Sequence, residues 1–437
     1  MRIRLAAAAA LVLASTGARA DTVEVSSTTM LMGRQEFRLP ASTSVSQTVE
    51  LRTVVPLLEL LSLSARDIQN PVVENLQLEL STWGGLELAD HRWQPGLGQS
   101  SDFSGDLDLA YVRGDLFSRA LTVRLGRQHV VEGNARMLHL DGVDAAVRLP
   151  ANLGISGYFG KPVASRFDAV GTDRTTNPTR GDYAGGGRVS YLLPGWFEAG
   201  ASFAWAVDHG ELSRQDLGGD LRITPLRALT LNGFVDYSLY EARLAEGTAM
   251  ATWQMSRKLS LAADYSHLEP DLFLPRDSIL AVFSNGKQDN VGGTIHLAPC
   301  LGVGVDGIYH ALFEPGGTGH DARLKGTVHP YSPYTTVGGE LRYLHNTDNG
   351  YSEARLFGGQ ELGRLALTLD LQGFYFEQRV NGERTSLLAT ATAGYDLGGG
   401  FRAQVSAAGG ATPFVSDQLE FMAKLVYNQT YHVREVR

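Results

Sequence analysis

Charged and polar side chains recur at alternate positions in one stretch of the chain, residues 119–144. Within it, Arg124 and Gln128 alternate with an apolar series that begins at Leu121 and includes Leu125. Successive side chains of a β-strand point to opposite faces, so this spacing places Arg124 and Gln128 on the face opposite the apolar one. Two such strands side by side would bring acids, bases and imidazoles together on one wall, where they could contact a charged solute.

A second strand extends this set of inward positions. Its apolar phase, set by Leu138 and Leu140, predicts that His139 and Asp141 point inward as well. The predicted inward residues beside a lumen are Asp106, Asp108, Arg113, Arg124, Gln128, His139 and Asp141, with Glu79 as a further inward position. Such a mixture could line a constriction that sets selectivity, or it could form a ladder of cross-strand ion pairs that braces the wall. The sequence leaves both interpretations open and favours the ladder.

No motif for other chemistry accompanies these residues. The chain contains no Gly-x-Ser-x-Gly, His-Glu-x-x-His, Gly-x-x-x-x-Gly-Lys or Cys-x-x-Cys-His sequence. The 11 His residues lack metal-ligand spacing, and the single Cys300 cannot form an intramolecular disulfide. His139 and Asp141 are the best pair for a hydrolase embedded in the wall, but the same spacing describes two inward positions of a strand. We therefore predict no catalytic, cofactor or metal site and no enzyme.

Alternating apolar residues continue along most of the chain and predict the elements that position this wall. In the clearest case, the four leucines of residues 365–371 alternate with small or polar residues such as Thr368 and Asp370. No layer of helices and no second sheet is evident to cover so many apolar faces, so lipid is their natural partner. Only a closed barrel of strands satisfies every backbone polar group in a bilayer. The predicted fold is therefore all-β, a transmembrane antiparallel barrel.

The connections between these strands show a second regularity. Tight turns, such as residues 194–195 and 398–400, alternate with longer and more polar loops, such as residues 164–181 and 269–287. Short periplasmic turns and longer outer loops are typical of outer-membrane barrels.

The strand count and the domain boundaries follow from these connections. Counting from Asn75 to Thr430 predicts about 20 strands, within a range of roughly 18–22, in a barrel domain of residues 71–437. Residues 21–70 either add further strands or form a periplasmic or lumenal extension, and the pattern does not decide between the two.

The first 20 residues predict a secretory signal peptide. Arg2 and Arg4 precede a ten-residue apolar run, Leu5 to Ala14, and residues 18–20 fit the small-x-small cleavage rule. The run is too short to span a bilayer, which needs about 20 apolar residues. The mature chain is therefore expected to start at Asp21.

Composition agrees with a membrane barrel and excludes one class of partner. The chain has 50 Gly among 437 residues, 9% aromatic and 19% charged residues, and a mean hydropathy of -0.10. Removing the leader takes away three arginines and no acid, which leaves 35 basic and 47 acidic residues, a net charge of -12. An excess of acid argues against nucleic acid as a partner.

Two motifs resemble known outer-membrane proteins. The sequence VRLGRQ (123–128), followed by HLDGVDAAVRLP (139–150), resembles a strand pair of porin-like outer-membrane barrels. LSTWGGLELAD (80–90) and FLPRDSILAVFSNGK (273–287) resemble segments of uncharacterised large-barrel proteins from Gram-negative bacteria. The resemblance implies a bacterial outer-membrane location and contact with lipid and the barrel-insertion machinery. One departure is the C-terminus, which ends at Arg437 rather than on an aromatic residue.

These observations predict a porin-like channel that passes small hydrophilic solutes or ions, with assembly of identical chains as an open question. The alternative is a structural sleeve that holds a periplasmic partner, such as a multihaem cytochrome, inside the barrel. The chain has no haem-attachment motif of its own, so a sleeve would need a partner chain. Polar loops folded into the lumen would favour the channel, and an empty bore would favour the sleeve.

The cleavage site gives a first testable prediction. N-terminal sequencing of the protein from the membrane fraction should read Asp-Thr-Val-Glu, because cleavage after Ala20 exposes Asp21. A mature protein that still begins at Met1 would contradict the predicted leader.

Overall fold

The strands of the protein form one antiparallel sheet in a computed structural model. The structure describes residues 20–38, 50–68, 70, 72–89, 103–133, 138–163, 182–208, 210–272, 286–330, 332, 334–347, 349–415 and 418–432. The strands are β1 (Ala20–Arg38), β2 (Glu50–Val54), β3 (Pro56–Ile68), β4 (Glu74–Glu87), β5 (Phe103–Leu116), β6 (Leu121–Val130), β7 (Leu138–Leu149), β8 (Leu153–Pro162), β9 (Tyr183–Leu193), β10 (Phe197–Asp208), β11 (Glu211–Leu226), β12 (Leu229–Ser238), β13 (Arg243–Ser256), β14 (Leu259–Leu268), β15 (Gln288–Leu297), β16 (Val303–Glu314), β17 (Gly317–Val328), β18 (Thr335–His345), β19 (Gly350–Leu362), β20 (Leu365–Val380), β21 (Glu383–Gly398), β22 (Phe401–Ala411) and β23 (Gln418–His432). Two short 3-10 turns, η2 (Pro150–Asn152) and η4 (Pro270–Leu272), lie in the connections.

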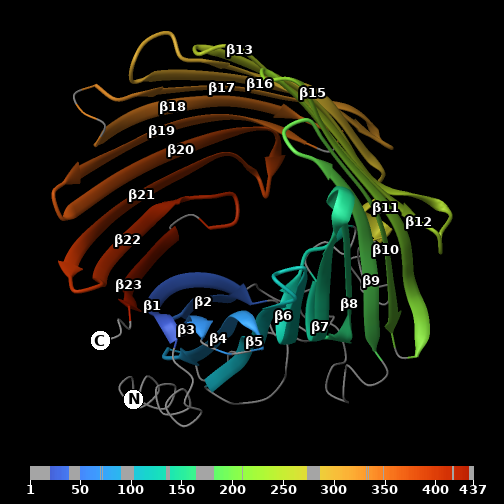
Figure 1. The fold of residues 1–437 in the computed structure, drawn as a ribbon. Coiled ribbons are helices and arrows are strands. Elements are labelled where there is room, and N and C mark those ends of the chain that lie inside the picture. Colours follow the sequence, from blue (N-terminus) through green and yellow to red (C-terminus); the bar gives the residue numbers. More distant parts are fainter. Residues whose placement is uncertain are drawn as a thin grey trace.

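The sheet closes on itself through its first and last strands. From β3 to β23 each strand pairs antiparallel with the next, and β1 pairs with both β23 and β3. The described wall therefore has 22 strands, because β2 pairs only with the far end of β1. Figure 1 shows the resulting ring, with β1 between β23 and β3. The predicted all-β barrel of about 20 strands is confirmed.

The N-terminal segment belongs to this wall. β1 and β3 form a hairpin whose register runs from Ala20 opposite Ile68 to Leu31 opposite Leu57. Beyond the wall the hairpin continues, because Arg34 to Arg38 pair with β2. The predicted leader, residues 1–20, lies outside the described residues except for Ala20.

One buried carboxylate fastens the junction between β2 and β3. Glu87, which is 6% exposed, accepts hydrogen bonds from Val55 N at 2.7 Å and from Ala89 N at 3.0 Å. Val54 beside it is fully buried. Main-chain donors at the break between two strands lack ladder partners, so a side-chain acceptor at this point stabilises the bend.

Exposure alternates along the strands and separates the two faces of the wall. On β8, Leu153, Ile155 and Phe159 are 39–49% exposed, whereas Tyr158 between them is 6% exposed. The same alternation holds on β20, where Leu369 is 49% exposed and Asp370 pairs with Arg355 of β19. The apolar face is the outward one, because hydrocarbon chains can cover it without unpaired polar groups.

The two ends of the barrel differ. Tight turns at one end depend on left-handed backbone, as at Gly195, where φ is +77°. The opposite end carries the connection between β6 and β7 and the connection between β14 and β15. Since outer-membrane barrels keep their short turns in the periplasm, the opposite end faces the exterior. It is called the outer end below.

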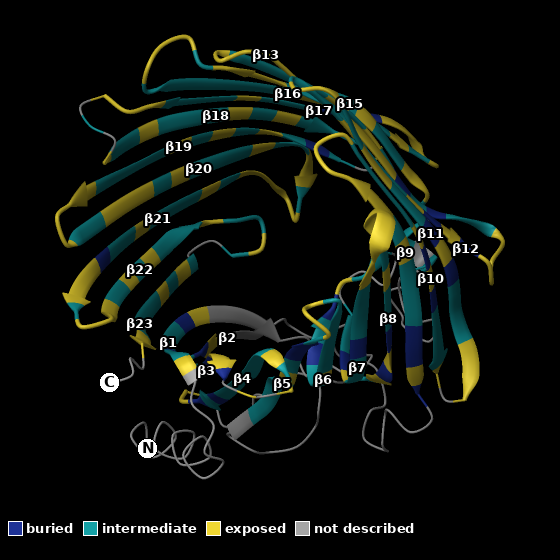
Figure 2. Cartoon of the chain, in the orientation of Figure 1, coloured by how far each residue is buried: buried dark blue, intermediate teal, exposed yellow. Residues whose placement is uncertain are grey.

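Buried residues gather on one side of the barrel. They are concentrated on the strands from β3 to β12, while the wall from β13 to β22 is mostly of intermediate or high exposure (Figure 2). Side chains on the inner face of an empty bore would be wet, so this asymmetry indicates that chain segments cover the inner face on the buried side. Among the described residues, no helix is both long enough and apolar enough to cross a membrane.

The two faces of β20 give a matched pair of substitutions. Leu369→Arg should lower the free energy of unfolding by about 2–4 kcal/mol if the residue lies at the midplane, because it places a guanidinium in lipid. Thr368→Arg, on the inward face next to it, should cost less, since its charge can reach water. Urea unfolding in detergent micelles or bilayers measures both, and a larger loss for Thr368→Arg would contradict the assigned faces.

Candidate functional site

An ion pair braces the inner face of β6 and β7. Arg124 Nε donates to Asp144 Oδ2 at 2.7 Å, and the two residues stand opposite each other in the strand register. Asp144 is 5% exposed. Arg113 of β5 lies opposite Arg124 on the other side, so both arginines occupy the predicted inward face. A buried carboxylate that is paired in this way holds the two strands together and fixes the guanidinium in place.

Similar pairs recur around the inner wall. They join Arg188 to Asp220, Arg214 to Asp236, Arg342 to Asp321 and Arg355 to Asp370. Arg342 is bidentate, with both of its bonds to the Asp321 carboxylate at 2.9 Å. The wall therefore carries cross-strand ion pairs, with positive and negative groups close together, although of the residues predicted for such a ladder only Arg124 takes part in these pairs.

A short segment after β6 folds across this inner face. Ser156 Oγ of β8 donates to Glu132 Oε2 at 2.7 Å. A Cβ added at Gly133 would lie 2.3 Å from Ser202 Cβ of β10 and 3.5 Å from Arg188 Cδ. Ser156, Arg188 and Ser202 form one row across β8, β9 and β10 in the register. The segment Val131–Gly133, called the inward segment below, therefore lies over this row inside the barrel.

Gly133 is the residue that permits this approach. Its φ is +51°, and the contact with Ser202 leaves no room for a side chain. Glycine alone combines left-handed backbone with so close a contact at little steric cost.

The inward segment accompanies a small apolar cluster. Val130 and Leu140 are fully buried, and they pack with Tyr158 and Ala184. Gln128 is also fully buried and donates weakly to Gly142 O at 3.4 Å. The prediction that Gln128 points inward agrees with its register, but the side chain is covered rather than exposed to a lumen.

The predicted inward direction of His139 and Asp141 is wrong. In the register, His139 lies opposite His129 and Asp141 opposite Lys161, on the same phase as the exposed Phe159 of β8. The prediction assumes that Leu138 and Leu140 face lipid. Leu140 instead faces inward, where the apolar cluster keeps it dry, so its neighbours face outward.

Asp108 also differs from its prediction. The register between β4 and β5 shifts at this point, since Ser81 pairs with Leu109 but Thr82 pairs with Leu107. Arg113 of the same strand faces inward, and Asp108 is five positions away from it, so alternation along β5 places Asp108 on the outward side, where its carboxylate lies 3.7 Å from His129 Nε2. A regular strand cannot direct both Arg113 and Asp108 inward, because an odd number of positions separates them.

Asp106 lies at the same irregularity. Its Oδ1 accepts from Leu107 N at 2.8 Å and lies 3.5 Å from Arg127 Nη1. Arg127 itself forms a bidentate pair with Asp141, both bonds being 2.8 Å. The sequence therefore grouped two different sites, an inner ion-pair wall and an outer polar cluster.

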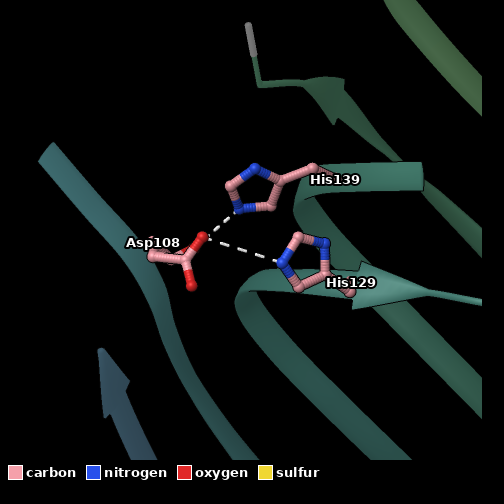
Figure 3. A group of neighbouring side chains, drawn as sticks. All are labelled: Asp108, His129 and His139. Atoms are coloured by element: carbon pink, nitrogen blue, oxygen red, sulfur yellow. Dashed lines mark hydrogen bonds and ion pairs between the residues drawn. The ribbon is translucent and has the colours of Figure 1, made fainter. Parts of the chain in front are cut away.

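The outer polar cluster brings two imidazoles to one carboxylate. His139 Nε2 lies 2.6 Å from the main-chain oxygen of Asp108, and the ring centroids of His129 and His139 are 4.4 Å apart. Figure 3 shows both rings directed toward Asp108 from neighbouring strands. His129 was not among the predicted site residues, and its spacing from the other two in the sequence gives no motif.

The sequence also missed Glu132, Arg188 and Ser156. Nothing in their spacing indicates that they meet, because the contact depends on where the inward segment folds. Only the Glu-Gly-Asn sequence at residues 132–134, typical of a turn, marked the place.

Comparison with known proteins gives similarity of fold without similarity of sequence. The translocation pore of the P pilus usher PapC matches with a TM-score of 0.51 at 8% identity, over 94% of this chain and 100% of that chain. OccAB4 of Acinetobacter baumannii matches with a TM-score of 0.46 at 10% identity, over 95% and 99% of the two chains. OpdK of Pseudomonas aeruginosa, solved with vanillate, matches with a TM-score of 0.46 at 12% identity, over 94% of this chain and 98% of that chain. No protein-family model matches the chain, and no curated protein matches it.

The fold and its outward apolar face define the class of protein. A closed antiparallel barrel of 22 strands with outward leucines and inward ion pairs has the fold of porin-like outer-membrane barrels. This fold agrees with the bacterial outer-membrane location that the sequence predicts.

The Arg124–Asp144 pair gives a stability prediction. Arg124→Gln should lower the free energy of unfolding by about 2–4 kcal/mol, because it leaves the Asp144 carboxylate buried without its cation. The double variant Arg124→Gln/Asp144→Asn should recover part of this loss, since neither charge remains. The temperature at which the barrel loses its compact migration on a gel measures both. Equal losses in the single and double variants would contradict the bracing role.

Proposed function

We propose that this protein is an outer-membrane channel for small hydrophilic solutes and ions. The observation that carries the proposal is the inward segment, which places the Glu132 carboxylate on the inner wall beside Ser156 and Arg188. A segment of this kind narrows the bore from one side and brings a charge toward whatever passes.

The size of the barrel requires such a segment in a selective channel. Barrels of 16–18 strands already leave an aqueous channel, and a 22-stranded wall encloses a wider lumen that other proteins of this size fill with a plug. A bore without internal elements would not distinguish small solutes. The inward segment reduces the open width from one side.

The charges on the inner wall support a preference for hydrophilic solutes. Arg188 Nη2 lies 2.6 Å from Asp220 and 3.5 Å from Glu198, so acid and base are close together near the inward segment. On another part of the inner wall, Arg355 lies 5.3 Å from the ring centre of Phe357. Paired charges of both signs offer hydrogen-bond partners to polar solutes in a wet lumen.

The sleeve interpretation gains no support from this arrangement. A sleeve needs a bore clear enough to admit a folded partner, whereas the inward segment occupies part of it. Contacts with lipid and with the barrel-insertion machinery, and the assembly of identical chains, stay predictions of the same proposal.

Charge removal at Glu132 tests the proposal. Glu132→Gln keeps the acceptor for Ser156 Oγ but removes a negative charge beside the path, so the preference for cations over anions should fall. Two unit charges 4 Å apart in water interact with about 1 kcal/mol. The ratio of cation to anion permeability should therefore change by at most about five-fold. Reversal potentials across a planar bilayer in a salt gradient measure this ratio.

The matched control is Glu377→Gln. Glu377 lies at the outer end of β20 on the outward face, where it pairs with His345, so its loss should leave selectivity unchanged. A wild-type protein that inserts but never conducts would contradict the channel. Equal selectivity in wild type and Glu132→Gln would contradict the role of the inward segment.

A further inference from the structure

We propose that Asp108, His129 and His139 bind a divalent transition-metal ion, such as Zn²⁺, on the outward face of the barrel at its outer end. The proposal rests on the geometry, the hydrogen bonding and the charge of the outer polar cluster.

The three side chains come from three adjacent strands and converge. One potential ligand atom from each residue lies within 4.8 Å of those of the other two. The distance between His129 Nε2 and Asp108 Oδ1 is 3.7 Å. Ligand atoms bound tetrahedrally to zinc at about 2.1 Å lie roughly 3.4 Å apart, so small side-chain rotations suffice. Figure 3 shows the two rings and the carboxylate directed at a common point.

The fold holds these residues in place before any ion binds. His129 and His139 stand directly opposite each other in the β6–β7 ladder, which fixes the separation of their main chains. Asp108 lies on the outward phase of β5, the same face as both imidazoles. Ligands carried by a rigid sheet lose little conformational freedom on binding, which favours a specific site.

The hydrogen bonding leaves His129 available as a ligand. Among the described residues, its Nδ1 is buried and has no hydrogen-bond partner. Its Nε2 lies 3.7 Å from Asp108 Oδ1, which is too long for a hydrogen bond. His139 Nε2 must leave one hydrogen bond, to the main-chain oxygen of Asp108, in order to bind an ion. The side chains of His129 and Asp108 are 34% and 44% exposed, so an ion can enter from solvent.

The surrounding charge favours a cation. The carboxylates of Asp106, Asp108 and Asp141 face the positive groups of Arg127 and Lys161, and Arg127 is already held by Asp141. The three carboxylates and two cations together carry a net charge of -1 before an ion binds. Two imidazoles with one carboxylate suit zinc, copper or nickel, whereas calcium and magnesium prefer oxygen ligands alone.

The position of the site suggests what a bound ion would do. His129 is the last residue but one of β6, and His139 is the second residue of β7. An ion held by both would clamp the two ends of the connection that contains the inward segment. This coupling rests on the proposed channel function, whereas the metal site itself does not.

Calorimetric titration of the untagged full chain in detergent with ZnCl₂ tests the site. Wild type should bind one ion saturably, and His129→Gln, His139→Gln and Asp108→Asn should each weaken binding at least ten-fold. His310→Gln is the matched control, because His310 pairs with the single carboxylate of Asp264 on the inner face. The proposal would be overturned if wild type does not bind Zn²⁺ saturably. It would also be overturned if wild type and the three site variants bind Zn²⁺ equally well.

A second measurement does not depend on the variants folding. Cu²⁺ bound to wild-type protein should show an electron paramagnetic resonance spectrum with nitrogen splitting from two imidazoles, and a spectrum with oxygen ligands alone would overturn the site.

A bilayer measurement tests the coupling to the channel. Zn²⁺ should reduce current fluctuations of wild type but not of His139→Gln. Unchanged fluctuations would overturn the coupling, and a protein that does not conduct would refute the channel while leaving the titration result intact.

Discussion

The rest of this structure depends on the pairing of every strand edge inside a membrane. A backbone N–H or C=O that faces hydrocarbon without a partner is costly, so a sheet in a bilayer must close. The closure is made by β1, whose residues 22–33 pair with β23 on one side and whose residues 20–31 pair with β3 on the other. Once the edge is closed, the alternation of side chains fixes which residues meet lipid and which meet the lumen.

This two-faced wall explains where the polar chemistry lies. Inward positions carry arginines and carboxylates in close pairs, as in Arg124 with Asp144 and Arg342 with Asp321. These pairs brace a wide barrel and also provide the charges beside the lumen. The inward segment adds Glu132 to that wall through a glycine that can touch Ser202. The strands on either side of this connection, β6 and β7, carry His129 and His139 of the outer polar cluster.

The sequence predicted the wall well and the site in part. Regular alternation of leucines on long strands determines the fold class, and it correctly placed Arg124 and Gln128 inward. The alternation failed at Leu140. An apolar residue indicates a surface away from water, but that surface can be the lipid-facing side or an apolar cluster inside the barrel. Leu140 packs in the cluster inside the barrel. The alternation also failed at Asp108, because Asp108 and Arg113 lie on opposite phases of β5 and cannot both face inward. The contact of Glu132 with Ser156 joins residues 24 apart in the chain, and no periodicity encodes it.

The central claim is that the inward segment lies in the path of permeating ions. The most direct measurement is the current through Glu132→Cys in a Cys300→Ser background during addition of a membrane-impermeant, positively charged thiol reagent. Covalent attachment at a site inside the lumen should reduce the current in discrete steps, while Leu125→Cys, on the lipid-facing side of β6, should leave it unchanged. A current that stays constant while mass spectrometry shows the Glu132→Cys thiol fully modified would contradict the account.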